Sequence, residues 1–418
     1  MTSAFLWLCA ARIGAFIAVF LLNAPTHAHL PELLGREYIP EPDPPPQVEE
    51  SCVDDRDELR DLIDAARREL DEAADNEDAY SVTLADGRGE LAKLYRDLCN
   101  YPAALDEIRK ALHAVRISDG LTSTSQLPYL RALAESYRGL GDYESAQKAL
   151  RQAFRIHDLG KGELSAQALE DSLAYFQLAR EVYTDPRSKA STRLFFEAFQ
   201  DNKAMLESQR ERALDYSNFE KIAISQLHNH YLLLGSDPDA NQLGSESNSA
   251  AWDFLVRNQV LSYARGIELL EELISRASDK APLVRARLQW RLANWHQWNV
   301  KHRRACDTYE VVWSLLQEAE DTTMIEKISA PAELPEDEQL YLHLYAADIP
   351  VKVRARASYK VSRRGDVSRL ELTTIDGESN GAVGRLRRWL KDSHVRPAIV
   401  SGVCEDGEIR DRVYRLLE

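Results

Sequence analysis

Residues 91–111, LAKLYRDLCNYPAALDEIRKA, determine the architecture because their pattern returns 42 positions later, at 133–153, as LAESYRGLGDYESAQKALRQA. Both copies place leucine-alanine, a tyrosine, a turn, a second tyrosine and two further alanines in one register. Apolar residues three or four positions apart predict a helix on each side of the turn. The alanines at matching positions would let the two helices pack closely, so each copy predicts an antiparallel helix pair.

A helix pair of this size does not bury its apolar face alone. It stacks on neighbouring pairs and builds an extended surface that typically binds another protein. A third copy of the register occurs later in the chain, as Leu292-Ala293, His296, Ala305, Tyr309 and Val312. The pattern therefore predicts a mostly α fold, with a helical-repeat solenoid over residues 51–330, whose activity is protein binding.

These signature positions resemble tetratricopeptide repeats. The resemblance implies right-handed stacking of helix pairs and a groove that binds a peptide or protein. Groove-facing positions in the first-helix register would be Lys93, Arg96, Arg131, Glu135, Arg138, Trp290, Asn294 and Trp298. The last three lie on one helix face, either as ligand-binding groups or as packing against the tail domain or the next helix.

The tail of the chain has a different period. Apolar residues alternate strictly with polar ones from Val351 to Val361, which predicts a strand with one buried face. A turn at Arg364-Gly365-Asp366, a helix over Val383–His394 and a last strand over Arg410–Leu417 follow. Residues 349–418 are thus predicted as a small α+β domain of order β-β-α-β, after a linker at 331–348.

This tail resembles the C-terminal domain of TonB. Val351–Val361 with Gly365-Asp366-Val367 matches that family's first hairpin, and Arg387-Arg388-Trp389 with Val395-Arg396-Pro397-Ala398 matches its helix and the segment after it. The resemblance implies docking of a peptide by strand addition to the last strand. The edge would comprise Arg410, Arg412, Tyr414 and Leu416.

The amino terminus is typical of an export signal. Arg12 precedes the apolar run Ile13–Leu22, and Thr26-His27-Ala28 offers small residues for cleavage. We expect a signal peptide at 1–28, a Pro-rich linker at 29–50 and a periplasmic protein of the Gram-negative envelope. The alternative is an uncleaved inner-membrane anchor facing the periplasm. The expected partners are envelope proteins or peptides, including outer-membrane transporter or assembly components, and an atypical TonB-like energy transducer is the alternative function.

Export also changes how the cysteines are interpreted. Four would remain after cleavage, which is consistent with two disulfides in an oxidising compartment. The favoured pairs are Cys52–Cys99 and Cys306–Cys404. For the second pair, two free buried thiols are the alternative.

Little in the sequence indicates catalysis. The net charge of −16 disfavours nucleic acid as a partner, although residues 351–418 carry 15 Lys/Arg against 10 Asp/Glu. No phosphate-binding loop, nucleophile elbow or zinc-protease motif is present. His302 and Cys306 lie one turn apart without further ligands nearby, so no metal and no cofactor are predicted. The protein is predicted not to be an enzyme, and only residues 184–250 are left for an enzymatic alternative.

Overall fold

A computed structural model describes residues 38–40, 56–76, 80–157, 164–184, 191–212, 215–235, 249–336, 340, 351–377, 381–393 and 395–417. The predicted signal peptide at 1–28, most of the predicted linker at 29–50, and Cys52 lie outside these residues. Within the described part of the chain, no helix is both long enough and apolar enough to cross a membrane.

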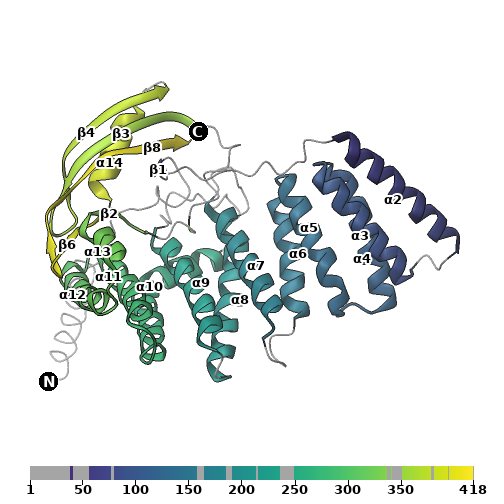
Figure 1. Ribbon diagram of the computed structural model, residues 1–418, viewed down its shortest axis with the longest axis horizontal. Helices are drawn as coiled ribbons and strands as arrows, with labels where there is room; N and C mark the ends of the chain where they lie inside the picture. The colour runs from purple at the N-terminus through teal and green to yellow at the C-terminus, as the bar shows by residue number, and fades with distance from the viewer. Residues whose placement is uncertain are drawn as a thin grey trace, which may run out of the picture.

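The helices stand side by side in one row, from α2 at one end to α12 at the other, and the C-terminal sheet arches over the α12 end (Figure 1). Sequential helices pack against each other as antiparallel pairs. Their bounds are α2 Arg56–Asn76, α3 Val82–Asp97, α4 Tyr101–Ser118, α5 Leu127–Gly139, α6 Tyr143–Ile156, α7 Ala166–Thr184, α8 Ser191–Glu211, α9 Tyr216–Gly235, α10 Ser249–Arg276, α11 Pro282–Trp298, α12 His302–Glu318 and α13 Thr322–Ser329.

The repeated alanines lie where the sequence predicts close helix contact. In both clear repeats they are almost fully buried: Ala92, Ala104, Ala111, Ala134, Ala146 and Ala153. The turn inside each pair is left-handed, at Cys99 (φ 57°) and Gly141 (φ 72°). The next residue then caps the second helix, because Asn100 accepts a hydrogen bond from the Ala103 amide and Asp142 accepts one from the Ser145 amide. The stacking continues through α7–α10, where the repeat register is weak in the sequence.

The C-terminal domain is built on a four-stranded antiparallel sheet in the order β1-β8-β3-β4. The predicted alternation is confirmed, since Val353, Ala355, Ala357, Tyr359 and Val361 are all buried. Helix α14 (Ala382–Asp392) packs Leu386, Trp389 and Leu390 into the same core. The strands are β1 Tyr38–Pro40, β2 Ala332–Glu333, β3 Val351–Val361, β4 Val367–Gly377, β5 Val395–Arg396, β6 Ala398–Val400, β7 Val403–Glu405 and β8 Gly407–Leu417.

Strand β8 is not at the edge of the sheet, which corrects the prediction for the last strand. It lies between β3 and β1, and Tyr38, Ile39 and Pro40 pair antiparallel with Leu416, Arg415 and Tyr414. Sequence patterns do not indicate this pairing, because three residues beside a Pro-rich segment carry no two-residue period. The chain thus adds a strand of its own to the predicted edge.

The two domains share one core. Leu232, Trp295 and Trp298 of the helical body belong to the same buried cluster as Val353 and Tyr359 of the sheet. The predicted linker at 331–348 begins inside this junction, since β2 pairs with β5 and both Leu334 and Leu340 are buried. The C-terminal domain is therefore packed onto the end of the solenoid.

Candidate functional site

Ion pairs run between the first helices of successive pairs, α3, α5 and α7. We call the surface formed by these three helices the first-helix face. Arg96 of α3 pairs with Glu135 of α5, and Arg138 of α5 lies 3.0 Å from Glu181 of α7. Five of the predicted groove residues are on these helices, and four of them, Arg96, Arg131, Glu135 and Arg138, join neighbouring repeats in this way.

Arg131 makes the strongest of these contacts. Its Nε and Nη2 donate to both carboxylate oxygens of Asp171, at 2.6 and 3.1 Å, and His157 lies 2.6 Å from the same group. Burial alone would raise the pKa of Asp171, but the hydrogen bonds from His157 and Arg131 outweigh it and lower that pKa. Asp171 is therefore a fixed anion that holds α5, α6 and α7 together.

The fifth residue, Lys93, is exposed on α3. Glu135 and Arg138 also keep much of their side chains in solvent, 63% and 47% exposed. Because most of the cations are already matched by carboxylates, the first-helix face offers a nearly neutral row of alternating charges. Such a row suits a polar peptide or protein surface better than a highly charged ligand.

The other three predicted groove residues lie inside the molecule. Trp290 and Trp298 are 6% and 3% exposed, and Asn294 is 7% exposed. Asn294 accepts a hydrogen bond from Tyr309 and donates one to Glu336. Trp298 packs against Tyr231 in the core shared with the sheet. All three therefore pack at the domain junction, the alternative left open by the sequence, and we do not count them as part of a partner surface.

Arg396 is the centre of that junction, and sequence patterns indicate no role for it beyond its match to the TonB segment. Its guanidinium is completely buried and lies over the Trp290 ring, 5.6 Å from the centroid. It donates to Glu336 Oε1 at 2.8 Å, and to the carbonyls of Ile328 and Lys327 at the end of α13. A C-terminal domain side chain thus caps a helix of the solenoid.

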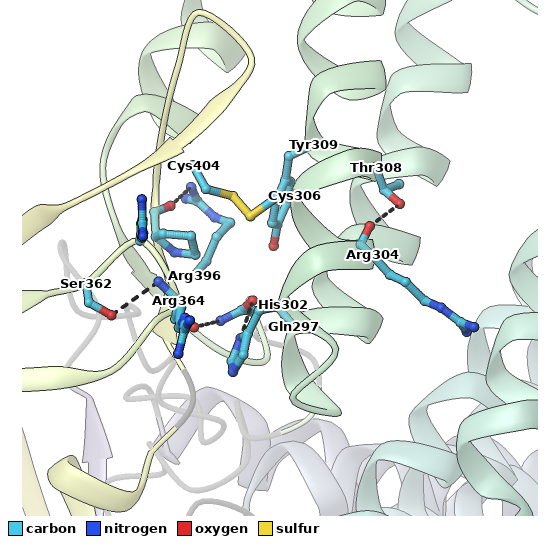
Figure 2. The surroundings of a disulfide bond; sticks show 12 residues. Gln297, His302, Arg304, Cys306, Thr308, Tyr309, Ser362, Arg364, Arg396 and Cys404 are labelled. Carbon is cyan, nitrogen blue, oxygen red and sulfur yellow. Dashed lines mark hydrogen bonds between the residues drawn. A yellow bond between two sulfur atoms is a disulfide. The ribbon is translucent and has the colours of Figure 1, made fainter.

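The β3–β4 turn and a disulfide complete the junction (Figure 2). Gln297 Nε2 donates to the carbonyls of Arg364 and Val395, at 2.8 and 3.0 Å. Gly365 is required there, because its φ is +92° and a Cβ would lie 2.2 Å from the Val395 oxygen. Cys306 of α12 is bonded to Cys404 of β7, which is the predicted pair.

Cys99 also takes part in a disulfide. Its predicted partner, Cys52, lies outside the described residues, so the pairing Cys52–Cys99 stays a prediction.

The junction decides which part of the solenoid is open to a partner. Every residue of α9 from Ser225 to Gly235, and every residue of α11 from Leu292 to Trp298, is buried. A helix segment that is buried all round lies in a core and presents no free face. The carboxyl-terminal parts of α9 and α11 therefore present no free face, whereas α3, α5 and α7, at the other end of the row, carry exposed polar side chains.

The predicted strand-addition residues have two orientations on β8. Arg410 is exposed, whereas Tyr414 and Leu416 are 0% and 2% exposed and belong to the sheet core. A bulge at Asp411, with φ 55°, changes the register between them. Arg412 lies 3.6 Å from Glu333, whose pKa is raised by burial against the opposing effects of Arg412 and the Tyr359 hydroxyl.

His228 and His230 lie among packed side chains. His230 Nδ1 lies 3.0 Å from Ser262 Oγ, and His228 is 3% exposed. Cys306 is used by the disulfide, so it does not form a metal site with His302. Among the described residues, no group of three or more His, Cys, Asp or Glu side chains could hold a metal ion.

Comparison with known proteins agrees with the repeat geometry. Residues 83–158, which span α3 to α6, match the tetratricopeptide repeat family. No curated protein matches the chain. The TPR-like repeats of a Podosopora anserina protein described as a kinesin light chain are 15% identical, with a TM-score of 0.36, and cover 58% of this chain and 99% of theirs. A single-substitution form of the same repeats has a TM-score of 0.35 at 15% identity and covers 57% of this chain and 96% of its own.

The helices form a TPR-like repeat solenoid, and the tetratricopeptide repeats matched at residues 83–158 imply a scaffold for protein–protein interaction. The likeness of the β-rich C-terminal domain to TonB stays a prediction.

Proposed function

We propose that this protein is a non-enzymatic scaffold of the Gram-negative periplasm, which binds one protein partner on the first-helix face and docks a second by strand addition to the C-terminal sheet. The observation that carries the proposal is the division of the solenoid. The carboxyl-terminal parts of α9 and α11 are buried all round, whereas α3, α5 and α7 keep exposed polar side chains. A fixed scaffold with one free face is suited to holding a partner.

The polar first-helix face supports a protein partner rather than a small molecule. Small-molecule sites are concave and mostly apolar, with a few convergent polar groups. Here Lys93 lies on α3 and Glu135 and Arg138 lie on α5, and the last two are paired with basic or acidic neighbours. An extended polypeptide could contact these helices at once.

The test compares two lysines on opposite sides of the repeats. Lys93 is exposed on first helix α3, and Lys148 is exposed on second helix α6, where its side chain is 66% exposed. Crosslinking in living cells, followed by mass spectrometry, should recover a partner with the native protein and with Lys148→Glu. Recovery should fall at least several-fold with Lys93→Glu. Equal loss in both variants, or in neither, would count against the first-helix face.

The periplasmic part of the proposal rests on the amino-terminal signal and on the cysteine pair. A disulfide between Cys306 and Cys404 is the kind of bond that persists in an oxidising compartment. Sequencing the amino terminus of the protein from a periplasmic extract should find a start near His29 or Leu30. Recovery of the uncleaved chain in the membrane fraction would favour the anchored alternative.

A further inference from the structure

Basic side chains from both domains meet beside the junction, and we call them the basic patch. They are Lys301, Arg303 and Arg304 in the α11–α12 turn, and Arg363 and Arg364 in the β3–β4 turn, all exposed. Gln297 holds the two turns together, because its side chain donates to the Arg364 carbonyl and lies 3.2 Å from His302 Nδ1. Figure 2 shows Arg364 beside His302 at the start of α12. The relative position of the two turns is therefore fixed by the fold.

The basic patch is not neutralised within the described part of the chain. On the first-helix face most arginines pair with carboxylates, but none of these five side chains forms an ion pair with a described residue. The acidic residues beside the β3–β4 turn have other donors, because Asp366 accepts from the Ser362 hydroxyl and Asp406 accepts from the Arg363 amide. Cations left unpaired in a chain of net charge −16 attract an anionic partner.

An exposed apolar stripe on α10 runs into the basic patch. Val256, Val260 and Tyr263 lie at i, i+4 and i+7, on one face of the helix. The two valines are 38% and 70% exposed. At Tyr263 the stripe meets the cations, since the Lys301 ammonium lies 5.7 Å from the ring centroid and Arg304 donates to the hydroxyl at 3.5 Å. Apolar and basic side chains thus form one continuous surface.

The residue directly before the basic patch is a valine in the left-handed conformation. Val300 has φ 58° and is 45% exposed. The same turn position is Cys99 in the first clear repeat and Gly141 in the second. A β-branched side chain rarely adopts this conformation, because its Cβ substituents crowd the backbone, and glycine or asparagine would fit the turn better. Packing alone does not explain the valine, since nearly half of it is in solvent.

We propose that the basic patch, together with Val256, Val260 and Val300, docks the protein on the surface of a bilayer that carries anionic lipids. Cations attract the anionic headgroups, and exposed aliphatic side chains among them enter the boundary between headgroups and acyl chains. An acidic protein would match the cations but would leave the exposed valines in contact with water. The inference goes beyond the proposed function, because it adds a lipid surface to the two protein partners.

Sedimentation with lipid vesicles tests the inference. The chain from residue 29 onward is used, because it lacks the apolar run Ile13–Leu22 and keeps every described residue. Phosphatidylcholine vesicles in which about one third of the lipid is phosphatidylglycerol are compared with vesicles of phosphatidylcholine alone.

Three variants are compared with the unmodified chain. They are the cation variant Arg303→Gln/Arg363→Gln/Arg364→Gln, the apolar variant Val260→Ser/Val300→Asn, and the control Arg68→Gln/Arg155→Gln, which neutralises exposed arginines of α2 and α6. Asparagine tolerates the left-handed conformation, so Val300→Asn preserves the turn. Circular dichroism and urea unfolding check that each variant is folded.

The unmodified chain and the control should bind the anionic vesicles and leave the phosphatidylcholine vesicles unbound. The cation variant should bind about a hundredfold more weakly, which is about fivefold for each cation near the surface. The apolar variant should bind about tenfold more weakly, because less apolar area leaves water. Absence of binding to anionic vesicles, equal binding to both kinds of vesicle, or equal weakening in the control would overturn the inference. Weakening in the cation variant alone would overturn the bilayer as the partner and favour an acidic protein.

Discussion

Replacing Arg396 tests whether the C-terminal domain is held to the solenoid by one buried cation. In Arg396→Met the apolar stem is kept and the guanidinium is lost. Glu336 then loses its 2.8 Å partner, and the Ile328 and Lys327 carbonyls lose their donors. Removing one member of a buried ion pair costs about 3–5 kcal/mol, because the other charge stays buried.

The structure places the expected value near the lower end of that range. Glu336 is 13% exposed and keeps the hydrogen bond from Asn294 Nδ2. We therefore expect the free energy of unfolding of the disulfide-bonded protein to fall by about 3 kcal/mol in urea. Arg388→Met, on the exposed side of α14, is the matched control and should change it by less than about 0.5 kcal/mol.

A double-mutant cycle separates the ion pair from general packing. In the double variant Arg396→Met/Glu336→Gln, the free energy of unfolding should fall by less than the sum of the two single-variant losses. Both charges are then removed, so no buried charge is left unpaired. A loss below about 1 kcal/mol in Arg396→Met, or strict additivity in the cycle, would refute the role given to this pair.

Three further predictions concern stability. The disulfide closes a loop with a sequence separation of 98 and so restricts the unfolded chain. In Cys306→Ser/Cys404→Ser the free energy of unfolding in urea should therefore fall by up to about 4.7 kcal/mol. A fall of less than about 1 kcal/mol would contradict this explanation by chain entropy. Burial, with the charges of Arg265 and Lys203, lowers the pKa of His230 to about 3. The unfolded chain takes up a proton on His230 near pH 6.5, whereas the folded protein does not. The free energy of unfolding should therefore be constant above that pH and fall by about 2 kcal/mol by pH 5. In His230→Gln this fall should be smaller. Asp171→Asn should cost about 3 kcal/mol in thermal unfolding, whereas Glu170→Gln, its exposed neighbour on α7, should change little; equal effects would contradict the role of Asp171 as a fixed anion.

Local periodicity predicted much of the fold. The spacing of Ala104, Ala111, Ala146 and Ala153 located the helix contacts, and the alternation in Val351–Val361 assigned the buried side of β3. Both patterns depend only on neighbours in sequence, because each helix or strand sets its own period. In the tail, the first two long strands, the helix and the last strand were readable for the same reason, whereas the three short strands β5, β6 and β7 between α14 and β8 were missed.

Long-range contacts were not readable in this way. Nothing local marks Tyr38–Pro40 as a partner of β8, which lies more than 360 residues later. The contacts of Gln297 with the Arg364 and Val395 carbonyls depend on how two domains dock. The spacing of Trp290, Asn294 and Trp298 is equally compatible with a partner-binding groove and with packing between domains. Only the position of the C-terminal domain shows that these residues pack. The sequence predicted a turn at Gly365, but its close approach to the Val395 carbonyl is seen only in the folded structure.

The most direct test of the first-helix face is a photo-crosslinking comparison in living cells. A photoreactive amino acid is placed at Lys93 on the first-helix face, or at Lys148 on the opposite side of the repeats. We expect Lys93 to capture one defined protein partner on irradiation and Lys148 to capture none. Capture of the same partner at Lys148 with equal efficiency, or of no protein at Lys93, would contradict the claim that the first-helix face is a protein-binding surface.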